Sequence, residues 1–338
     1  MRITTMGIDL AKNVFQIHGV DENGKVLVRK KLPRSKLMEF IANTPVCLIG
    51  VEACGGSHYW VRQFKKHGHK VKMMPPQYVK PFVKTNKNDL NDAEAICEAV
   101  QRPNMHFVSE KSIEHQDIQS VHRIRQRLVR ARTALANEMR GLLSEYGIIL
   151  GQGIKVLRKR LPEILEEETL GDLTVLTREI FFKIYEEFCE LDERVKFFDQ
   201  KIEQIFRSNE ACKRLAQIEG VGPLIATAAI ATIGNPHHFK NGRQCAAWLG
   251  LVPRQSSSGG KTILLGISKR GDSYLRSLLV HGGRAVVAWL KDKKDPRSNW
   301  IREKEKTRGK NKTAVAVANK NARIIWKMLK TGENYRAA

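Results

Sequence analysis

The sequence lacks the features that would assign it to three large classes of protein. Its six cysteines include no pair at Cys-x-x-Cys spacing, and no histidine cluster completes a zinc site. The stretch before Asp9 is too polar for a signal peptide, and no apolar run reaches the roughly 18 residues of a membrane span. We therefore expect neither a zinc protein, nor a disulfide-bonded secreted domain, nor a membrane protein. The chain should be cytoplasmic, with mostly buried and reduced cysteines.

Acidic residues are scarce relative to basic ones. The 338 residues include 59 Lys and Arg but only 35 Asp and Glu, which gives a net charge of +24. The hydrophobic content of 42% is ordinary for a globular protein, so the charge does not come from a disordered tail. A surplus of this size indicates nucleic acid as the partner, because Lys and Arg release the counterions of phosphates. The length suggests about two domains.

The first hundred residues alternate between strand-like and helix-like stretches, which indicates an α/β layer fold. The first three strands should form an antiparallel meander. Strands are expected at 3–8, 14–20, 25–31, 46–51 and 69–74, and helices at 35–42 and 57–66.

The middle of the chain is expected to be helical. Residues 112–146 contain many arginines, not confined to one stripe, so some must be solvated or paired. Leu128, Leu135 and Leu142 recur at a heptad spacing, which predicts a packed seam. Residues 163–203 are acidic and should not face DNA; a helix pair for protein contacts and a solvated helix face are equally good interpretations.

The last third is basic and mainly helical. Gly220 and Gly222 lie between two apolar helices and resemble a helix-hairpin-helix turn, whose backbone N–H groups suit a phosphate, or they simply form a tight turn. Residues 255–260 are rich in Ser and Gly, a composition typical of a flexible loop, and a helix should span 272–290.

Four carboxylates stand at positions that a core would not favour. Asp9 and Glu52 each end an apolar strand, where open α/β sheets bind ligands. Asp89 and Asp92 share one face at a helix start. If the four converge, their repulsion must be balanced by protons or cations, and two Mg²⁺ ions about 4 Å apart would suit a phosphodiester displacement. Taken singly, each acid could be a strand-end turn residue or a helix N-terminal residue.

These motifs resemble those of a known family. Residues 7–12 (GIDLAK), 51–53 (VEA) and 88–93 (NDLNDA) are similar to the DEDD domain of insertion sequence 110 transposases, particularly their eleven-eleven branch. Residues 245–255 (CAAWLGLVPRQ), 256–261 (SSSGGK) and 266–271 (GISKRG) extend the resemblance. It implies a ribonuclease-H/RuvC-like domain at 1–110, a coiled-coil-like dimerisation region at 111–208 and a mainly α transposase domain at 209–338.

The resemblance also implies roles for individual residues. Asp9, Glu52, Asp89 and Asp92 would hold the two Mg²⁺ ions, and Ser257, or Ser258 if the alignment slips by one, would form a covalent phosphoserine with DNA. The helical region and the terminal domain are implied to hold a guide RNA encoded by the element. From the residues themselves, the expected nucleic-acid contacts are Arg123, Arg127, Arg130, Arg140, Gly220, Gly222, Lys261, Lys269 and Arg270. For the last three, a role in surface solubility is an equally good interpretation.

Three functions compete. The first is a recombinase that cleaves and exchanges strands by serine attack without net hydrolysis. The second is a Holliday-junction-type nuclease that uses the same acids to activate water. The third is a non-enzymatic nucleic-acid binder whose acids are structural. Strand exchange between two duplexes needs more than one serine, so the first function also predicts a homo-oligomer, either a dimer or a tetramer.

Overall fold

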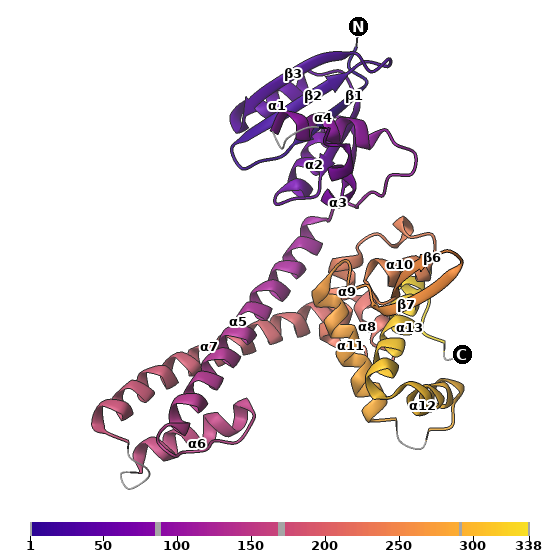
Figure 1. Cartoon of the computed structure of the whole chain (residues 1–338). Helices are drawn as coiled ribbons and strands as arrows, with labels where there is room; N and C mark the ends of the chain where they lie inside the picture. Colours follow the sequence, from indigo (N-terminus) through magenta and orange to yellow (C-terminus); the bar gives the residue numbers. More distant parts are fainter. Residues whose placement is uncertain (1, 85–88, 168–172, 291–292, 337–338) are drawn as a thin grey trace. The chain divides into compact units, whose positions relative to one another are not determined.

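The structure is a computed structural model that describes residues 2–84, 89–167, 173–290 and 293–336 (Figure 1). The backbone of Asp89 is described, but its side chain is not. The chain divides into two units, Met1–Ser112 and Ile113–Ala338. The expected boundary at 110 lies close to this division, while the one at 208 falls inside the second unit and stays a prediction.

A five-stranded mixed sheet forms the centre of the first unit. Its strands are β1 (Thr5–Asp9), β2 (Val14–Val20), β3 (Val26–Pro33), β4 (Leu48–Glu52) and β5 (Lys70–Met74). In the order β3-β2-β1-β4-β5, the first three strands are antiparallel and β1, β4 and β5 are parallel. The mixed sheet confirms the α/β prediction, and the meander is present as expected.

Helices cover both faces of this sheet. They are α1 (Arg34–Ala42), α2 (Ser57–Lys66), α3 (Pro76–Val79), η1 (Lys80–Phe82) and α4 (Asp89–Val100). One face carries Ile8 and Val51, which share an apolar cluster with Trp60 and Phe64 of α2. Strand side chains alternate between faces, and the residues before Ile8 and Val51 are glycines that meet α4 on the opposite face.

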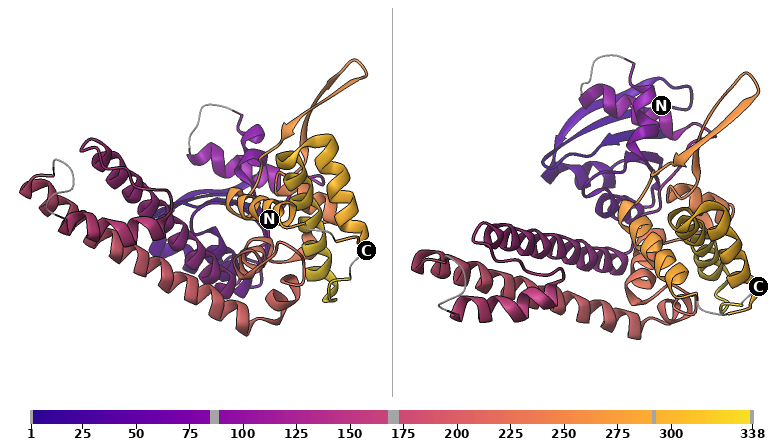
Figure 2. Two further views of the ribbon diagram at one scale, coloured as in Figure 1. Left: turned by 90° about the horizontal axis from the view of Figure 1, so that it is seen from below. Right: turned by 60° about the horizontal axis from the view of Figure 1, so that its bottom comes forward.

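The second unit begins with long helices. They are α5 (Ile113–Ser144), α6 (Ile154–Glu166) and α7 (Val175–Ser208). Helices α5 and α7 lie side by side and antiparallel (Figure 2), because Arg125 contacts Asp199 whereas Arg132 contacts Asp192. The acidic stretch thus belongs to a helix pair, but its described partner is α5 of the same chain.

The heptad seam is corrected in part. Leu128 is buried and Leu135 is half-buried, but Leu142 is 42% exposed. The residues buried near the end of α5 are Met139 and Leu143 instead. A straight helix drifts by about 20° per heptad against a strict seven-residue repeat, so the third leucine has rotated out of the seam.

The rest of the second unit is mainly helical, as expected. Its elements are α8 (Glu210–Leu215), α9 (Pro223–Ile233), η2 (Pro236–His238), α10 (Gly242–Trp248), β6 (Pro253–Ser258), β7 (Lys261–Ile267), α11 (Ser273–Ala288), α12 (Pro296–Arg308) and α13 (Lys310–Thr331). Helix α9 is apolar and buried along nearly its whole length among α8, α10, α11 and α13. No helix within the described ranges has the length and apolar character needed to cross a membrane.

The cysteines follow the expectation with one exception. All six are free thiols, and four of them are buried, whereas Cys189 is half-buried. Cys54 is exposed. Its position, two residues after Glu52, becomes important in the candidate site.

Candidate active site

Asp9 and Glu52 end neighbouring parallel strands. β1 and β4 are in register from Thr5 opposite Leu48 to Ile8 opposite Val51, so the two acids follow at the same edge of the sheet. Both are half-buried. They lie two residues beyond Gly7 and Gly50, and the period of two along a strand places them on the face that α4 covers.

Two glycines allow α4 to approach this face closely. A Cβ on Gly7 would lie 2.2 Å from the carbonyl oxygen of Ala93, and one on Gly50 would lie 2.8 Å from the Cβ of Val100. Cys97 lies nearer the start of β1, because its Sγ donates to the carbonyl oxygen of Thr5 at 3.9 Å. Helix α4 therefore runs antiparallel to β1, and its first turn points toward the edge that ends at Asp9.

The structure places three of the four expected acids. Asp9 and Glu52 come together, and Asp92 is half-buried on the first turn of α4. The side chain of Asp89 lies outside the described residues. Among the side chains that are described, no three His, Cys, Asp or Glu residues are grouped closely enough to hold a metal ion.

Cys54 is a residue of this edge that the sequence analysis missed. Its Sγ donates to the carbonyl oxygen of Leu10 at 3.6 Å, which ties it to the end of β1. The residue as a whole is exposed, but its sulfur is partly covered, and this partial burial, together with the negative charges of Asp9 and Glu52, raises the pKa of its thiol. The charges of both carboxylates therefore reach the thiol of Cys54. The position of this cysteine two residues after Glu52 was the sequence feature that could have predicted it.

The donor set fits a hard divalent cation. Carboxylate oxygens are the ligands that Mg²⁺ prefers, and it usually takes one or two from the protein and completes its shell with water and phosphate oxygens. Asp9 and Glu52 could supply these, and Asp89 and Asp92 belong to the first turn of α4. The thiol of Cys54 is a soft donor, which a hard cation such as Mg²⁺ does not prefer.

The serine segment is a β-hairpin rather than the flexible loop expected. Ser257 pairs with Thr262 and Ser258 with Lys261, and the two-residue turn consists of Gly259 and Gly260. Both glycines have positive φ, of 54° and 77°, as a type I′ turn requires. A Gly-Gly pair between two strands is a hairpin signal that the sequence analysis overlooked.

The two candidate serines face opposite sides of this hairpin. Every residue of β6 is exposed, and the hairpin extends away from the helices of its own unit (Figure 2). The Nε2 of Gln255 donates to the Oγ of Ser257 at 2.8 Å, whereas Ser258 shares its face with Lys261. Only one of the two hydroxyls can therefore face a given phosphate.

Lys269 and Arg270 lie at the base of the hairpin on tightly packed backbone. A Cβ on Gly250 would lie 2.4 Å from the carbonyl oxygen of Arg270. That oxygen also accepts from the Nη1 of Arg276 at 2.7 Å. The backbone is therefore fixed, while the side chains of Lys269 and Arg270 are exposed, as is Lys261 near the tip.

The pairing of α5 with α7 divides the arginines of α5 into an internal group and an exposed group. Arg125 and Arg132 face α7 and pair with Asp199 and Asp192, each at 2.5 Å. Arg123, Arg127 and Arg130 lie on the opposite stripe, exposed, and form no ion pair among the described residues. The expectation that some arginines would be paired is confirmed.

Arg140 has contacts within the fold. Its Nε donates to the carbonyl oxygen of Gly151 at 3.2 Å and its Nη2 donates to that of Gly153 at 2.8 Å. These bonds hold the connection between α5 and α6. The expected contact with nucleic acid stays a prediction for this residue.

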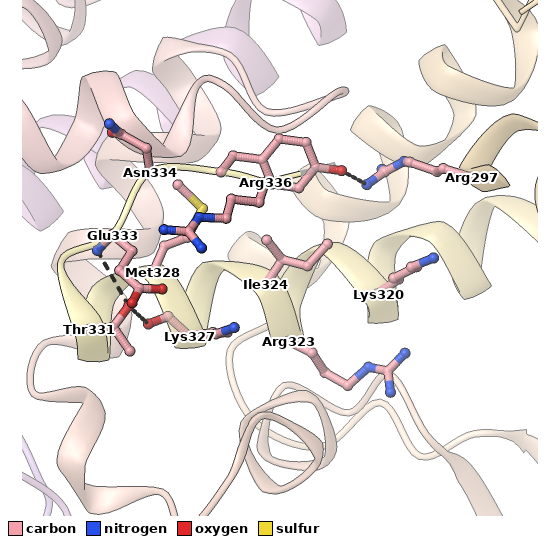
Figure 3. Close-up of a pocket in the computed structure, with 11 residues that line it drawn as sticks. Arg297, Lys320, Arg323, Ile324, Lys327, Met328, Thr331, Glu333, Asn334 and Arg336 are labelled. Carbon is pink, nitrogen blue, oxygen red and sulfur yellow. Dashed lines mark hydrogen bonds between the residues drawn. The ribbon is translucent and has the colours of Figure 1, made fainter. Parts of the chain in front are cut away.

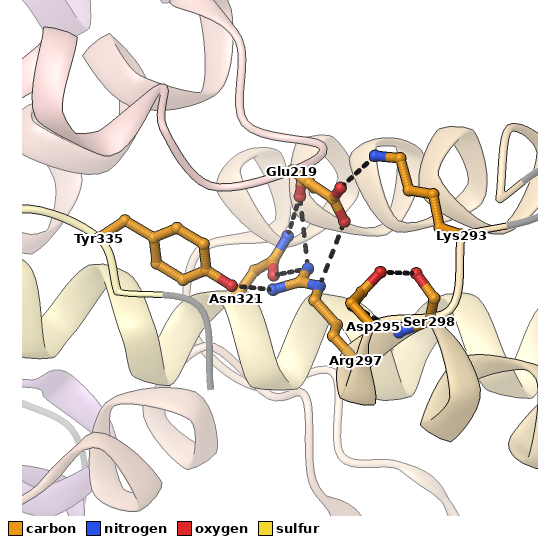
Figure 4. A network of polar contacts seen from close by, with 7 residues as sticks. All are labelled: Glu219, Lys293, Asp295, Arg297, Ser298, Asn321 and Tyr335. Atoms are coloured by element: carbon orange, nitrogen blue, oxygen red, sulfur yellow. Dashed lines mark hydrogen bonds and ion pairs between the residues drawn. The ribbon is translucent and has the colours of Figure 1, made fainter.

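The turn at Gly220 is tied into the fold by a polar network (Figure 4). Gly220 has φ of +81°, and a Cβ there would lie 2.7 Å from the carbonyl oxygen of Gly282 on α11. The neighbouring carbonyl of Glu219 accepts from the Nδ2 of Asn321 at 3.0 Å, and the Oδ1 of Asn321 accepts from Arg297 at 2.7 Å. Packing accounts for Gly220, whereas Gly222 has open space around it at the N-terminus of α9.

Known proteins are similar in sequence to this chain along nearly its whole length. A DEDD transposase model of IS110 elements matches residues 6–148, and a model of the IS116/IS110/IS902 transposase family matches residues 212–298. A probable family 20 transposase of Pseudomonas aeruginosa is 46% identical over 99% of both chains. The transposase for insertion sequence element IS1111A of Coxiella burnetii is 45% identical over 99% of this chain and 92% of its own. The transposase for insertion sequence element IS1328 of Yersinia enterocolitica is 39% identical over 96% of both. The chain belongs to the IS110 family of insertion-sequence transposases.

Proposed function

We propose that this transposase cleaves and exchanges DNA strands through a serine of the β6–β7 hairpin, assisted by the acidic edge of the N-terminal sheet. Membership of the family implies an enzyme that cuts and rejoins DNA. The observation that carries the finer proposal is the position of Asp9 and Glu52, at one edge and on one face of the sheet.

Asp9 and Glu52, with Asp89 and Asp92 from the first turn of α4, would hold two Mg²⁺ ions. Bound there, the ions would stabilise the attacking and leaving oxygens of a phosphodiester displacement. The runner-up, a junction nuclease, would use the same acids with water as the nucleophile. The exposed serines of β6 favour the recombinase, because their side chains are accessible to a phosphate.

Ser257 is the proposed nucleophile, with Ser258 as the alternative. The Oγ–P bond forms as the P–O bond to the leaving strand breaks, and the leaving oxygen ends as a hydroxyl that carries the proton of the serine. The reverse reaction with a different strand end restores a phosphodiester, so no water is consumed. Exchange between two duplexes requires serines from more than one copy, and we therefore propose a homo-oligomer.

Exposed cations would position the nucleic acid. Arg123, Arg127 and Arg130 offer one basic stripe, and Lys261, Lys269 and Arg270 offer another around the hairpin. Such contacts fix register but read no sequence. We propose that sequence is read by a guide RNA that pairs with donor and target DNA.

The test is a search for the covalent intermediate. The full chain, purified with any RNA that accompanies it, is incubated with element-end DNA and Mg²⁺ and resolved on a denaturing protein gel. We expect a DNA-shifted band that falls by at least about a thousandfold in Ser257→Ala and in Asp9→Ala. Ser256→Ala is the matched control, because it removes an exposed hydroxyl from the same hairpin and should retain the band.

Other results would redirect the proposal. A band lost in Ser258→Ala and kept in Ser257→Ala would move the nucleophile by one residue. Cleaved DNA with free 5′ phosphates and no shifted band would mean hydrolysis by the acidic edge. Intact DNA bound by a well-folded, oligomeric protein would leave only a nucleic-acid binder.

A further inference from the structure

The C-terminal tail closes a cavity on helix α13. The cavity has a volume of about 300 Å³, at the lower end of the range for small-molecule sites. It lies between α13 and residues 333–336, with Arg297 of α12 at one end (Figure 3). We call it the tail pocket, and nothing in the recombination chemistry above uses it.

Positive charge dominates the lining of the tail pocket. Among the described side chains, only Arg297 meets an acid, Glu219, with its Nε 3.6 Å from the carboxylate oxygen. Glu333 is the single acid of the lining itself. The cations of the lining are Arg297, Lys320, Arg323, Lys327 and Arg336.

Burial and the neighbouring cations act together on Lys320. Burial, followed by the charges of Arg297 and Arg323, lowers the pKa of Lys320. The Nε atoms of Arg297 and Arg323 are also buried without a hydrogen-bond acceptor among the described residues. Like charges held together in this way are relieved when an anion binds between them.

The interior of the tail pocket is apolar and contains an aromatic ring. Ile324 and Met328 line it from α13, and Tyr335 lines it from the tail. The backbone N–H of Tyr335 donates to the Oε1 of Gln217 at 2.9 Å, and its hydroxyl accepts from the Nη1 of Arg297 at 3.3 Å. The ring is therefore anchored at both ends before any ligand arrives.

We infer that the tail pocket binds one unpaired nucleotide of a single-stranded segment. Its base would lie against Ile324, Met328 and Tyr335, and its phosphates would contact Lys320, Arg323 and Lys327. An aromatic platform beside a row of cations suits single strands, since every base has a face that can stack. A duplex base is already stacked and paired, so it cannot enter. The inference rests on the proposed nucleic-acid function and adds a specific contact to it.

Binding can be tested without cleavage, in Ser257→Ala protein and without Mg²⁺. We would measure fluorescence anisotropy with labelled single strands about ten nucleotides long, as RNA and as DNA of the same sequence. Arg323→Ala/Lys327→Ala should weaken single-strand binding at least tenfold. Arg308→Ala/Lys306→Ala is the matched control, because it removes the same two charges from exposed positions of α12 and should cost less than threefold.

The aromatic contribution is tested separately. Tyr335→Ala should weaken single-strand binding, whereas Tyr335→Phe, which keeps the ring, should restore most of it. Tighter binding of RNA than of DNA, or the reverse, identifies the source of the strand, and either supports the inference. The inference would be overturned if Arg323→Ala/Lys327→Ala weakened the binding of a duplex of the same length as much as that of the single strand. It would also be overturned if the two double variants lost the same single-strand affinity. Because no covalent step is involved, a missing phosphoserine would leave this result unaffected.

Discussion

The acidic edge of the N-terminal sheet and the serine hairpin are built in opposite ways. Asp9 and Glu52 end central strands of a sheet that has helices on both faces, and both are half-buried. Every residue of β6 is exposed, and a Cβ on either glycine of its Gly-Gly turn would meet open space. Ligands that share a metal must be held within fractions of an ångström, whereas a nucleophile on an exposed arm can reach a phosphate bound elsewhere. The proposed reaction therefore places different demands on the two regions.

The largest expected effect would come from filling the space under α4. Gly7→Ala places a methyl group 2.2 Å from the carbonyl oxygen of Ala93, so the helix or the strand must move. We expect the free energy of unfolding to fall by about 3 kcal/mol, at the upper end of the usual cost of overpacking. Chemical denaturation of the full chain, followed by circular dichroism, measures this change.

Two other glycine-to-alanine substitutions serve as controls for Gly7→Ala. Gly19→Ala lies in the same sheet, where the new Cβ would meet Ile3 at an ordinary 3.4 Å, and it should cost less than about 1 kcal/mol. Gly260→Ala changes the hairpin turn, where φ is +77° and no atom lies within 4 Å, so only a local backbone cost of about 1 kcal/mol is expected. Similar losses in the free energy of unfolding for Gly7→Ala and Gly19→Ala would contradict the close approach of α4 to the sheet.

In contrast to the exposed hairpin, helices α5, α9 and α11 pack around a buried histidine. His122 of α5 is 3% exposed and lies 3.0 Å from both the Tyr274 hydroxyl on α11 and the Thr227 hydroxyl on α9. Burial, reinforced by Arg125, lowers its pKa from 6.5 to about 4. Between these values the unfolded chain binds more protons, so stability falls as the pH drops from about 6.5 to about 4.

The size of this effect follows from the two pKa values. From pH 7 to pH 5, His122 should lower the free energy of unfolding by about 2 kcal/mol. Urea titrations at both pH values measure the loss in the native chain and in His122→Gln, which can form hydrogen bonds but cannot take a proton. The variant should lose about 2 kcal/mol less over this interval. An identical pH dependence in the two proteins would show that His122 is not buried as described.

The smallest expected effect separates the two stripes of α5. Arg127→Ala should weaken nucleic-acid binding a few-fold and reduce the slope of log K against log salt by about one, because one phosphate contact is lost. Arg125→Ala removes the same charge from the stripe that faces Asp199 and should leave that slope unchanged. Equal salt slopes in both variants would mean that the exposed stripe does not contact nucleic acid.

Much of the secondary structure could be predicted because it depends on sequence patterns a few residues long. Strand-like stretches in the first hundred residues predicted the strands of the sheet, and the ends predicted for 14–20 and 57–66 agree with β2 and α2. The family could be predicted because its acidic motifs are short and contiguous. The hairpin was missed although its signal was local, since a Gly-Gly pair was interpreted as a loop.

Other features depend on residues distant in sequence and could not be read locally. The partners of Arg125 and Arg132 lie 74 and 60 positions further along the chain, so only the pairing of α5 with α7 separates these arginines from Arg127. Cys54 is an ordinary thiol until the register of β1 with β4 brings both acids beside it.

The sequence by itself determined the strand–helix order, the positive charge, the strand-end position of Asp9 and Glu52, and the family. The tertiary structure decided which face of the sheet the acids share, which arginines are internal, and that the serines stand on an exposed hairpin. It also decided that a basic helix and the tail enclose a pocket. The physical reason is that propensity and periodicity act over a few residues, whereas close approach, charge pairing and burial depend on which segments pack together.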